Sequence, residues 1–300
     1  MRALIVGNAT VDLLTGGETR IGGSVYYGGR ALAKHMGVET YGLTRASDRV
    51  RDLVSGALLE AGVKPVILGA EESPVFVVNR GKAVEFRGSS PPIPWDVVAE
   101  YLESTGFDAV IFAPIMREVE PEAILEAGRR AGPVYAADIQ GFVRKVTAVE
   151  IKCEWSNVLE EVLPILHIVH GNISEYCFAK CERDVLKKIV DLSTVSNTIY
   201  LASADNRGTY LVHRREVYHI PPLPVNAVDD VGAGDVLLAV STYYLATGKE
   251  ALEATTRGVV AASLKTQNPA GEWFTPSIIE ELWRKHVAEA RRVEAWMKRV

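Results

Sequence analysis

Residues 229–235 combine carboxylates with three small residues, directly before an apolar segment of helical length. Gly232, Ala233 and Gly234 allow a tight turn and leave the backbone uncovered by side chains. The first turn of the expected helix presents unpaired N–H groups, and its dipole favours negative charge there. The stretch therefore predicts an anion site, with Asp235 beside it as a general base for phosphoryl transfer.

A glycine-rich loop before a helix is weak evidence by itself, because most such loops bind nothing. The longer run Asp-Asp-Val-Gly-Ala-Gly-Asp over 229–235 resembles the signature Asp-Thr-x-Gly-Ala-Gly-Asp of the ribokinase-like (PfkB) family of sugar and nucleoside kinases. It lies in the last third of the chain, as in that family, and Asp230 stands where threonine is usual. The resemblance implies that Asp235 is the catalytic base. It also implies that the N–H groups of Gly232, Ala233 and Gly234 stabilise charge on the transferred group.

Asp12 comes shortly after the first expected strand, where open α/β sheets bind ligands in the crevice beyond their strand ends. A carboxylate there can accept two hydrogen bonds from a polyol, and an aspartate of a surface turn is the structural alternative. The resemblance implies that Asp12 binds sugar hydroxyls.

Gly22 and Gly23 begin the run Gly-Gly-Ser-Val-Tyr-Tyr-Gly-Gly before an expected helix. Alone, the run indicates either a flexible turn or close approach of the backbone to a ligand. It resembles the family's first signature, Gly-Gly-x-x-x-Asn, with Tyr27 at the asparagine position. The change predicts an acceptor other than ribose, with a ring that packs against Tyr26 or Tyr27.

Asp138, Gln140 and Arg144 follow another expected strand. As residues alone, they fit a substrate or phosphate contact as well as a structural Asp–Arg pair. The run Asp-Ile-Gln-Gly-Phe-Val-Arg resembles the Asp-Pro-Gln-Gly-x-x-Arg of ribokinase-like proteins close to inositol kinases. The whole pattern is closest to archaeal-type myo-inositol kinases, and this resemblance favours myo-inositol as the acceptor.

Asn172 and Glu175 stand where we expect a helix to begin, and an asparagine N-cap with a glutamate three residues later is a sufficient structural explanation. The spacing also resembles the family's Asn-x-x-Glu element, which implies that the pair organises Mg²⁺ and phosphates through water. Mg²⁺ keeps most of its waters and takes few carboxylates, so Glu175 alone is a reasonable metal contact.

Ser203, Arg207 and Gly208 follow a further strand, where the family has Thr-x-Gly-x-x-Gly near the nucleotide phosphates. Asp205 replaces the first of these glycines and would repel phosphate unless it points away. Asn268 falls where the family builds its adenine pocket. The resemblance implies that ATP, or a similar nucleotide, is the phosphate donor.

Short apolar runs alternate with helical segments, which predicts a ribokinase-like α/β fold: a mostly parallel sheet with helices on both faces. Strands are expected over 3–6, 39–43, 65–68, 109–113, 134–137, 165–169 and 198–202, and helices over 28–36, 50–60, 120–131, 157–163, 182–192, 231–246, 252–266 and 278–293. Two segments, about 11–22 and 70–92, predict antiparallel strands of a small β lid, with a hairpin turn at 80–82. We expect one domain over 1–300.

The net charge of −5 argues against nucleic acid or an anionic membrane as a partner. No apolar run has membrane-spanning length, and the N-terminal run is too short for a signal peptide, so we expect a cytoplasmic protein. Cys153, Cys177 and Cys181 are expected to be core or surface thiols, because no His or Cys pair stands near them to complete a metal site.

The sequence has no Walker run, and no Gly-x-Gly-x-x-Gly follows its first strand, which argues against other nucleotide-binding classes. We expect transfer of the γ-phosphoryl group of a nucleotide to a hydroxyl of a small sugar or cyclitol, best myo-inositol. A nucleoside or other hexose kinase is the alternative within the family. A sugar- or nucleotide-sensing protein that keeps the fold is the alternative outside enzymes, and either a monomer or a homodimer is compatible with the sequence.

Overall fold

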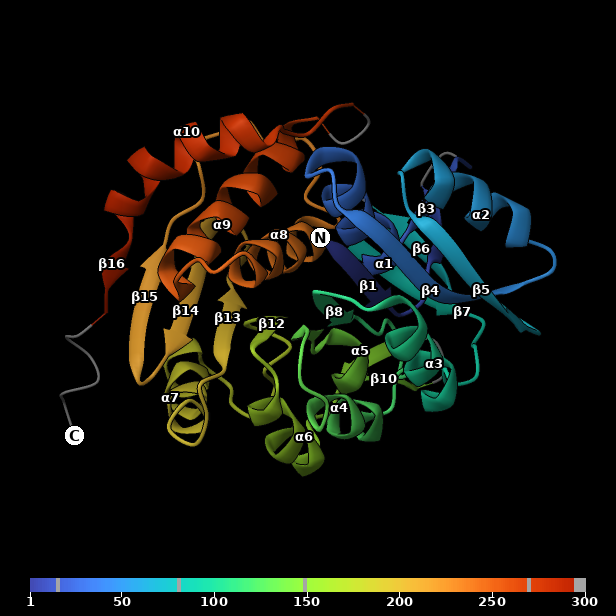
Figure 1. Cartoon of the computed structure of the whole chain (residues 1–300), viewed down its shortest axis with the longest axis horizontal. Coiled ribbons are helices and arrows are strands. Elements are labelled where there is room, and N and C mark those ends of the chain that lie inside the picture. The colour runs from blue at the N-terminus through green and yellow to red at the C-terminus, as the bar shows by residue number, and fades with distance from the viewer. Residues whose placement is uncertain (15–16, 80–81, 148–149, 269–270, 294–300) are drawn as a thin grey trace.

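A large twisted sheet runs through the computed structural model, which describes residues 1–14, 17–79, 82–147, 150–268 and 271–293 (Figure 1). Within these residues the sheet has ten strands, in the order β16 (Arg291–Arg292), β15 (Glu216–Ile220), β14 (Thr209–His213), β13 (Ile199–Ser203), β12 (Ile168–Asn172), β9 (Val134–Asp138), β8 (Ala109–Phe112), β1 (Arg2–Val6), β4 (Glu39–Ser47) and β5 (Lys64–Ala70). Neighbours from β13 to β5 are parallel, and those from β13 to β16 are antiparallel. The carboxyl ends of the parallel strands therefore meet at one edge, where such sheets bind ligands.

Helices cover both faces of this sheet, as Figure 1 shows. One face carries α1 (Ser24–Arg30), α2 (Arg51–Glu60), α8 (Ala233–Ala246), α9 (Ala251–Gln267) and α10 (Pro276–His286). The other carries α3 (Trp95–Thr105), α4 (Pro121–Gly128), α5 (Gln140–Val143), α6 (Asn157–Val162) and α7 (Glu182–Leu192). Strand β1 shows the reason, because Ala3 and Ile5 enter one core while Leu4 and Val6 enter the other. The predicted α/β class with two helical layers is confirmed.

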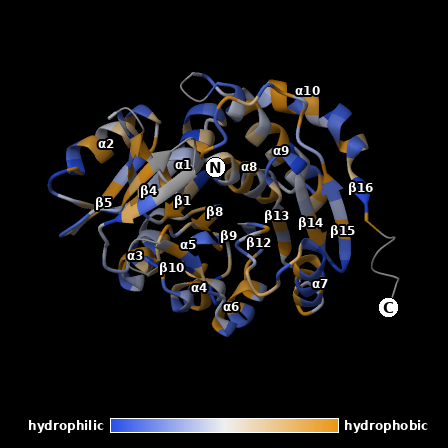
Figure 2. Ribbon diagram, turned by 180° about the vertical axis from the view of Figure 1, so that it is seen from behind, coloured by the Kyte–Doolittle hydropathy of each residue, from blue (hydrophilic) through white to orange (hydrophobic). Residues whose placement is uncertain are grey.

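The outer helices α7 and α10 are amphipathic, and Figure 2 shows hydrophilic and hydrophobic residues on both of them. Helix α8 is different, because all of its residues from Val236 to Thr242, and Tyr244, are buried. It packs against α9 and α1 in the middle of its layer. No helix in the described ranges is long and apolar enough to span a bilayer.

A second sheet of four strands, here called the lid, forms from the two segments that break the alternation. Its order is β3 (Thr19–Gly22), β2 (Thr10–Leu14), β6 (Val75–Asn79) and β7 (Lys82–Arg87). The pairs β2–β3 and β6–β7 are antiparallel as expected, but β2 and β6 run parallel because a long stretch of chain separates them. Residues 80 and 81 of the expected hairpin turn lie outside the described residues.

Two helix boundaries differ from the prediction. The first helix begins at Ser24 rather than Gly28, and a π-helical turn, η1 (Ala31–His35), continues it. Gly29 lies inside this helix. A larger residue would not fit there, because a Cβ would come within 2.7 Å of Val63 Cγ2. The last helix ends at His286, so the apolar residues expected on its final turns belong to a 3₁₀ turn, η4 (Val287–Glu289), and to the approach to β16.

A two-stranded hairpin that was not expected, β10 (Arg144–Thr147) and β11 (Glu150–Cys153), lies between the lid and the strand ends. It brings Cys153 to Cys177, and the two form a disulfide with a Cα–Cα distance of 6.1 Å. The expectation of free thiols is therefore wrong for this pair, because spacing along the chain does not reveal proximity between a hairpin and a loop. Cys181 is free and exposed.

Candidate active site

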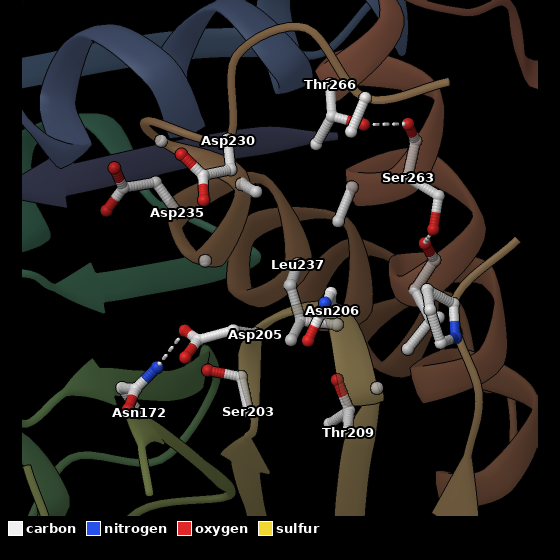
Figure 3. A pocket seen from close by; sticks show the side chains of 18 of the residues that line it. Asn172, Ser203, Asp205, Asn206, Thr209, Asp230, Asp235, Leu237, Ser263 and Thr266 are labelled. Atoms are coloured by element: carbon white, nitrogen blue, oxygen red, sulfur yellow. Dashed lines mark hydrogen bonds between the residues drawn. The ribbon is translucent and has the colours of Figure 1, made fainter. Parts of the chain in front are cut away.

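A cavity of about 600 Å³ lies at the N-terminus of α8, opposite the carboxyl ends of β9, β12 and β13. Of the residues singled out in the sequence, it is lined by Asp138, Gln140, Asn172, Glu175, Ser203, Gly208, Gly232, Ala233, Gly234 and Asp235. Figure 3 shows Asp230 and Asp235 on one side of this space, with Asn172, Ser203 and Asp205 facing them from the other. The fold thus brings together strand ends and a helix N-terminus that lie far apart in the sequence.

Asp235 lies in the first turn of α8, where the helix dipole favours a carboxylate. Its Oδ1 accepts a hydrogen bond from the Ser24 hydroxyl of α1. Burial, followed by the charge of Asp138, raises the pKa of Asp235 to about 7. A carboxyl group with a pKa near neutrality can both take up and release a proton at physiological pH, as a general base must.

Gly232 is the N-cap of α8 and has a left-handed backbone, with φ of 80°. A Cβ at this position would lie 2.3 Å from Cγ of Tyr27, so glycine is required by both backbone and space. The N–H of Ala233 donates to the carbonyl oxygen of Asp230 at 3.0 Å. That amide is therefore already bonded within the turn, and Gly232 and Gly234 are better placed to meet an anion.

His170 of β12, which the sequence reasoning missed, lies directly beneath this turn. A Cβ on Gly234 would come within 2.8 Å of its Cε1. Its Nδ1 is 2.7 Å from Asp138 Oδ2, and its Nε2 is 3.2 Å from Ser203 Oγ. Burial lowers the pKa of His170, but the charge and the hydrogen bond of Asp138 outweigh it and raise this pKa overall. The ring thus connects the Asp138 carboxylate to the Ser203 hydroxyl at the cavity wall.

A histidine two residues before Asn172, on the same expected strand, was the available signal for this group. Its significance depends on Asp138 and Ser203, which come from the neighbouring strands β9 and β13. Only the order of the strands reveals that these three side chains form one chain of hydrogen bonds.

Asn172 and Glu175 do not begin a helix, because β12 ends in a turn and α7 starts only at Glu182. The expected local bonds nevertheless form. The N–H of Asn172 donates to Glu175 Oε2 at 2.8 Å, and Asn172 Oδ1 accepts from the N–H of Ser174 at 3.0 Å. Burial and the charge of Asp138 raise the pKa of Glu175.

Asp205, which we expected to repel phosphate unless it points away, lines the cavity. Its Oδ1 accepts a hydrogen bond of 2.8 Å from Asn172 Nδ2, so the carboxylate is turned towards β12 (Figure 3). Gly208, which follows it, has a φ of 104°, and a Cβ there would lie 2.3 Å from the carbonyl oxygen of Ile220. The loop is thereby held close to β15, at the cavity wall.

Asp12 lies outside this cavity, within lid strand β2 rather than in a turn after β1, and is only 4% exposed. Its carboxylate accepts a hydrogen bond of 2.8 Å from Thr10 Oγ1, and a Cβ on Gly22 would come within 2.5 Å of its Oδ2. Burial raises the pKa of Asp12, with the Thr10 bond and Arg20 opposing this. Gly23, at φ of 85°, closes β3 against the backbone of Asn8.

Arg20 of β3 connects this carboxylate to the anion site. Its Nε is 3.6 Å from Asp12 Oδ2, and its Nη1 donates to Asp229 Oδ2 at 2.8 Å. The expected acceptor side and the loop of residues 229–235 are therefore joined through one guanidinium group.

Four other singled-out residues have structural contacts outside the cavity lining. Tyr27 is buried beneath Gly232 and stacks on Trp273, with ring centroids 6.4 Å apart. The Arg144 guanidinium is 3.7 Å from Glu175 Oε1. Arg207 pairs with Glu182 of α7, and Asn268 bonds to the backbone of Gly271 and Glu272.

The cavity continues past the phosphate loop as an apolar arm. The segment after β15 contributes Leu223 and Val225, and α9 contributes Val259, Ala262 and Ser263. Ser263 Oγ accepts from the N–H of Leu223 at 3.1 Å and donates to the carbonyl of Val259 at 2.8 Å. Its hydroxyl is thus used within the wall, which leaves a mostly apolar lining at this end of the cavity, as is common in small-molecule sites.

The donor set of this site suits a hydrated cation better than a closed metal cage. In the part of the chain that the structure describes, no three His, Cys, Asp or Glu side chains are arranged to hold a metal ion. Glu175 and Asn172 supply one carboxylate and one amide at the cavity wall. Mg²⁺ binds in this manner, through few carboxylates, several waters and substrate phosphates.

Comparison with known proteins identifies the family of this chain. The family model described as pfkB family carbohydrate kinase matches residues 66–275. The chain therefore belongs to the pfkB family and is a sugar or cyclitol phosphotransferase. No curated protein matches the sequence significantly.

Solved structures share the fold at low sequence identity. A pyrophosphate-dependent kinase in the ribokinase family, complexed with a pyrophosphate analog and myo-inositol, is 19% identical with a TM-score of 0.75, over 93% of this chain and 98% of that one. A pyrophosphate-dependent myo-inositol-1 kinase converted into a myo-inositol-3 kinase is 19% identical with a TM-score of 0.76, over 96% and 98%. Ribokinase of Arabidopsis thaliana with ribose and ATP is 18% identical with a TM-score of 0.71, over 94% and 98%.

Proposed function

We propose that this protein transfers the γ-phosphoryl group of ATP, or of a similar nucleotide, to a hydroxyl of myo-inositol or a closely related polyol. The observation that carries this proposal is Asp235, whose pKa is raised to about 7 at the N-terminus of α8, beside a cavity with the dimensions of a small-molecule site. Sugar or cyclitol kinase is the class that the family defines. The donor, the acceptor and the residue roles are our proposal.

In this proposal the acceptor hydroxyl approaches Asp235, which takes its proton as the oxygen attacks the γ-phosphorus. The bond from that phosphorus to the β,γ-bridging oxygen breaks, and ADP leaves with the bridging oxygen. The N–H groups of Gly232 and Gly234, with the dipole of α8, stabilise negative charge on the transferred group. The Ser203 hydroxyl, polarised by His170, donates to a donor phosphate.

The apolar arm favours a nucleotide over pyrophosphate as the donor. Pyrophosphate has no group that would fill the slot between Leu223 and Ala262, whereas a purine ring would bury its faces there. Glu175 and Asn172 would hold Mg²⁺ through water, and the ion would neutralise charge on the donor phosphates. Gly208 allows the backbone to approach these phosphates.

The acceptor is proposed to bind between the lid and Asp235. Asp12 would accept hydrogen bonds from its hydroxyls, with Gly22 and Gly23 leaving room for the ring. Two similar structures carry myo-inositol in their descriptions, and the Asp138–Arg144 run resembles that of inositol kinases, which supports a cyclitol. A lid that closes over the acceptor would exclude water, which otherwise competes for the phosphoryl group.

A cytoplasmic location, as a monomer or homodimer, suits the negative charge and the proposed substrates.

A coupled assay of ADP release, with ATP and Mg²⁺ and a panel of polyols, tests the proposal. We expect turnover with myo-inositol by the wild-type protein, and none above background by Asp235→Asn. Strong turnover of ribose or adenosine, with none of inositol, would contradict the proposed acceptor and indicate a nucleoside or other sugar kinase. Binding of nucleotide with no turnover of any polyol, by wild type and variant alike, would favour the sensor instead.

Pyrophosphate is included as an alternative donor in the same panel. Faster turnover with pyrophosphate than with ATP would contradict the role that we give to the apolar arm, without affecting the role of Asp235. Replacement of Ala262 by Trp, which fills the arm, should then raise the KM for ATP and leave any use of pyrophosphate unchanged.

A further inference from the structure

Lys265, near the end of α9, is a fully buried lysine with 0% exposure that neither the family pattern nor the cavity lining singled out. Its Nζ donates to the carbonyl oxygen of Asp229 at 3.2 Å and to that of Val231. Val231 immediately precedes Gly232, the N-cap of α8, and Asp229 lies two residues before Val231. The ammonium group thus contacts the backbone of the anion-site loop from the side opposite to the cavity.

The residue after Lys265 binds the same loop through its backbone. The carbonyl oxygen of Thr266 accepts hydrogen bonds from the N–H of Val228 at 2.8 Å and of Asp229 at 3.1 Å. The last turn of α9 therefore provides a donor for the loop's carbonyls and an acceptor for its amides. The Asp229 carboxylate completes the turn by accepting from the N–H of Val231 at 2.9 Å.

The surroundings of the ammonium group are charged but contain no directly bonded carboxylate among the contacts found for it. Asp229 and Asp230 of the loop, Asp235 of α8, Arg20 of β3 and the ring of Tyr27 face it, and the Tyr27 ring centroid is 5.3 Å from Nζ. A buried cation held by neutral carbonyls and an aromatic face contributes little to stability, because its lost hydration is not offset by a paired charge. Its place behind the anion site needs another explanation.

We propose that Lys265 is a positioning residue for phosphoryl transfer: its ammonium group fixes the carbonyls of Asp229 and Val231, so that the N–H group of Gly232 points into the cavity. Peptide planes are rigid, so fixing a carbonyl on one side of the loop fixes the amide that follows on the other. The positive charge also reduces the electrostatic cost of placing phosphate beside Asp230 and Asp235. This inference rests on the proposed function.

Replacement of Lys265 by Met tests this role, because methionine fills a similar volume and removes only the charge and the donors. We expect kcat to fall about 100-fold, as when one group that stabilises the transition state is lost. The KM for the acceptor should change little. The melting temperature should stay the same or rise. Folding lowers the pKa of Lys265 to about 8, which means that the charged lysine destabilises the folded state, most fully below that pH, and methionine removes this cost.

Arg257→Met is the matched control, since Arg257 is the other fully buried cation on α9. Its Nε and Nη2 donate to Glu280 at 2.8 and 3.1 Å, and the group lies 3.6 Å from the Trp283 ring centroid, far from the loop. This variant should lower the melting temperature and leave kcat unchanged; Arg257→Lys serves if it does not fold. If the role of Lys265 were purely structural, Lys265→Met would also lower the melting temperature and leave kcat unchanged.

Lys265→Ala provides a second test, because it leaves space for a small cation. Ammonium or methylammonium chloride should restore part of kcat, whereas tetramethylammonium chloride at equal ionic strength should not. No rescue, together with unchanged kcat in Lys265→Met, would overturn the inference.

Calorimetry keeps failure of the inference separate from failure of the proposed function. A non-hydrolysable ATP analogue should bind the wild type several-fold more tightly than Lys265→Met, while adenosine binds both equally. If no polyol is phosphorylated by the wild type, the proposed function fails, and this difference still supports the positioning role. Equal binding of the analogue to both proteins would contradict it.

Discussion

The proposed donor side of the site is an open cavity of about 600 Å³ between α8, α9 and the ends of the parallel strands, whereas the proposed acceptor side is a buried carboxylate on a separate sheet. On the donor side, the Ser203 hydroxyl and the turn at Gly232 already face empty space. On the acceptor side, Asp12 is 4% exposed, accepts a hydrogen bond from Thr10 and forms an ion pair with Arg20. The donor side is thus preformed, and the acceptor must compete with bonds that exist without it.

This difference predicts that substitutions divide into two groups. Changes on the donor side should alter kcat or the KM for the nucleotide, and changes on the lid should alter the KM for the acceptor. Only Asp235, which lies between the two sides, should stop the reaction with both substrates still bound. The following variants test this division, beginning with the largest expected effect.

Asp235→Asn keeps the shape of the side chain and removes the base. We expect kcat to fall about 1,000-fold, since general-base catalysis contributes about 10²–10⁴. Calorimetry should find the ATP analogue bound with little change in affinity. A residual rate within tenfold of the wild type would show that the proton leaves the acceptor by another route.

Gly232→Ala breaks the donor side alone. The alanine methyl group would meet the Tyr27 ring at 2.3 Å, at a left-handed φ of 80°, so the turn must shift. We expect a loss of about 100-fold in kcat, measured at saturating acceptor.

Gly248→Ala is its control, because Gly248 has a φ of 82° with nothing within 4 Å of a Cβ. Both variants carry the same backbone strain, and only Gly232→Ala disturbs the anion site. Equal losses of kcat in the two variants would show that the turn at Gly232 has no specific role in binding the donor.

Asp12→Asn tests the acceptor side. The loss of charge-assisted hydrogen bonds, each about 1.5–3 kcal/mol, should raise the KM for the acceptor about 10- to 100-fold. The KM for the nucleotide should change much less, because the two sides are linked indirectly, through the contact of Arg20 with Asp229. Asp48→Asn, at a side chain that is 99% exposed, is the control for charge alone. A rise of equal size in the nucleotide KM would show that the acceptor side and the donor side do not act separately.

The pH profile of kcat/KM tests the base in the intact protein. Because Asp235 has a pKa of about 7, activity should rise about tenfold per unit up to that pH and then level off. Stability should change in the opposite direction: a folded pKa above the unfolded value stabilises most below about pH 4, and this contribution is lost as the pH rises to 7. Asp235→Asn should remove both trends; a wild-type profile that is flat between pH 5.5 and 7.5 would exclude Asp235 as the base.

Ser203→Ala should have the smallest effect. It removes one neutral donor to the nucleotide phosphates, so the KM for ATP should rise about five-fold, corresponding to about 1 kcal/mol. The acceptor KM serves as the internal control. An unchanged KM for ATP would indicate that the chain from Asp138 through His170 ends without touching the donor.

Most residues that sequence reasoning assigned to the donor side line the cavity, because they follow strand ends, and parallel strands bring those ends together whatever their order along the chain. It did not find His170, since the partners of this ring come from two other strands. It also placed Tyr27 beside the acceptor, whereas the ring packs beneath Gly232. Which way a side chain turns from a glycine-rich helix start depends on packing, here against Trp273, and spacing contains no information about it.

The lid illustrates a second limit. Hydrophobic alternation identified its strands, but the direction in which β2 and β6 pair follows from the path of the intervening chain. The Cys153–Cys177 disulfide has the same origin, because it depends on where a hairpin meets a loop. Local patterns therefore predicted the elements, and the contacts between distant elements required the structure.

Arg20, which contacts both Asp12 and Asp229, makes the two sides thermodynamically dependent on each other. Removing either carboxylate leaves the guanidinium group to the other, so the free-energy effects of Asp12→Asn and Asp229→Asn will not add in the double variant. The same arrangement makes the effect of each side on the other reciprocal. Whatever draws Arg20 towards the acceptor weakens its hold on the phosphate loop, and whatever draws it towards the loop leaves Asp12 freer to accept a hydroxyl.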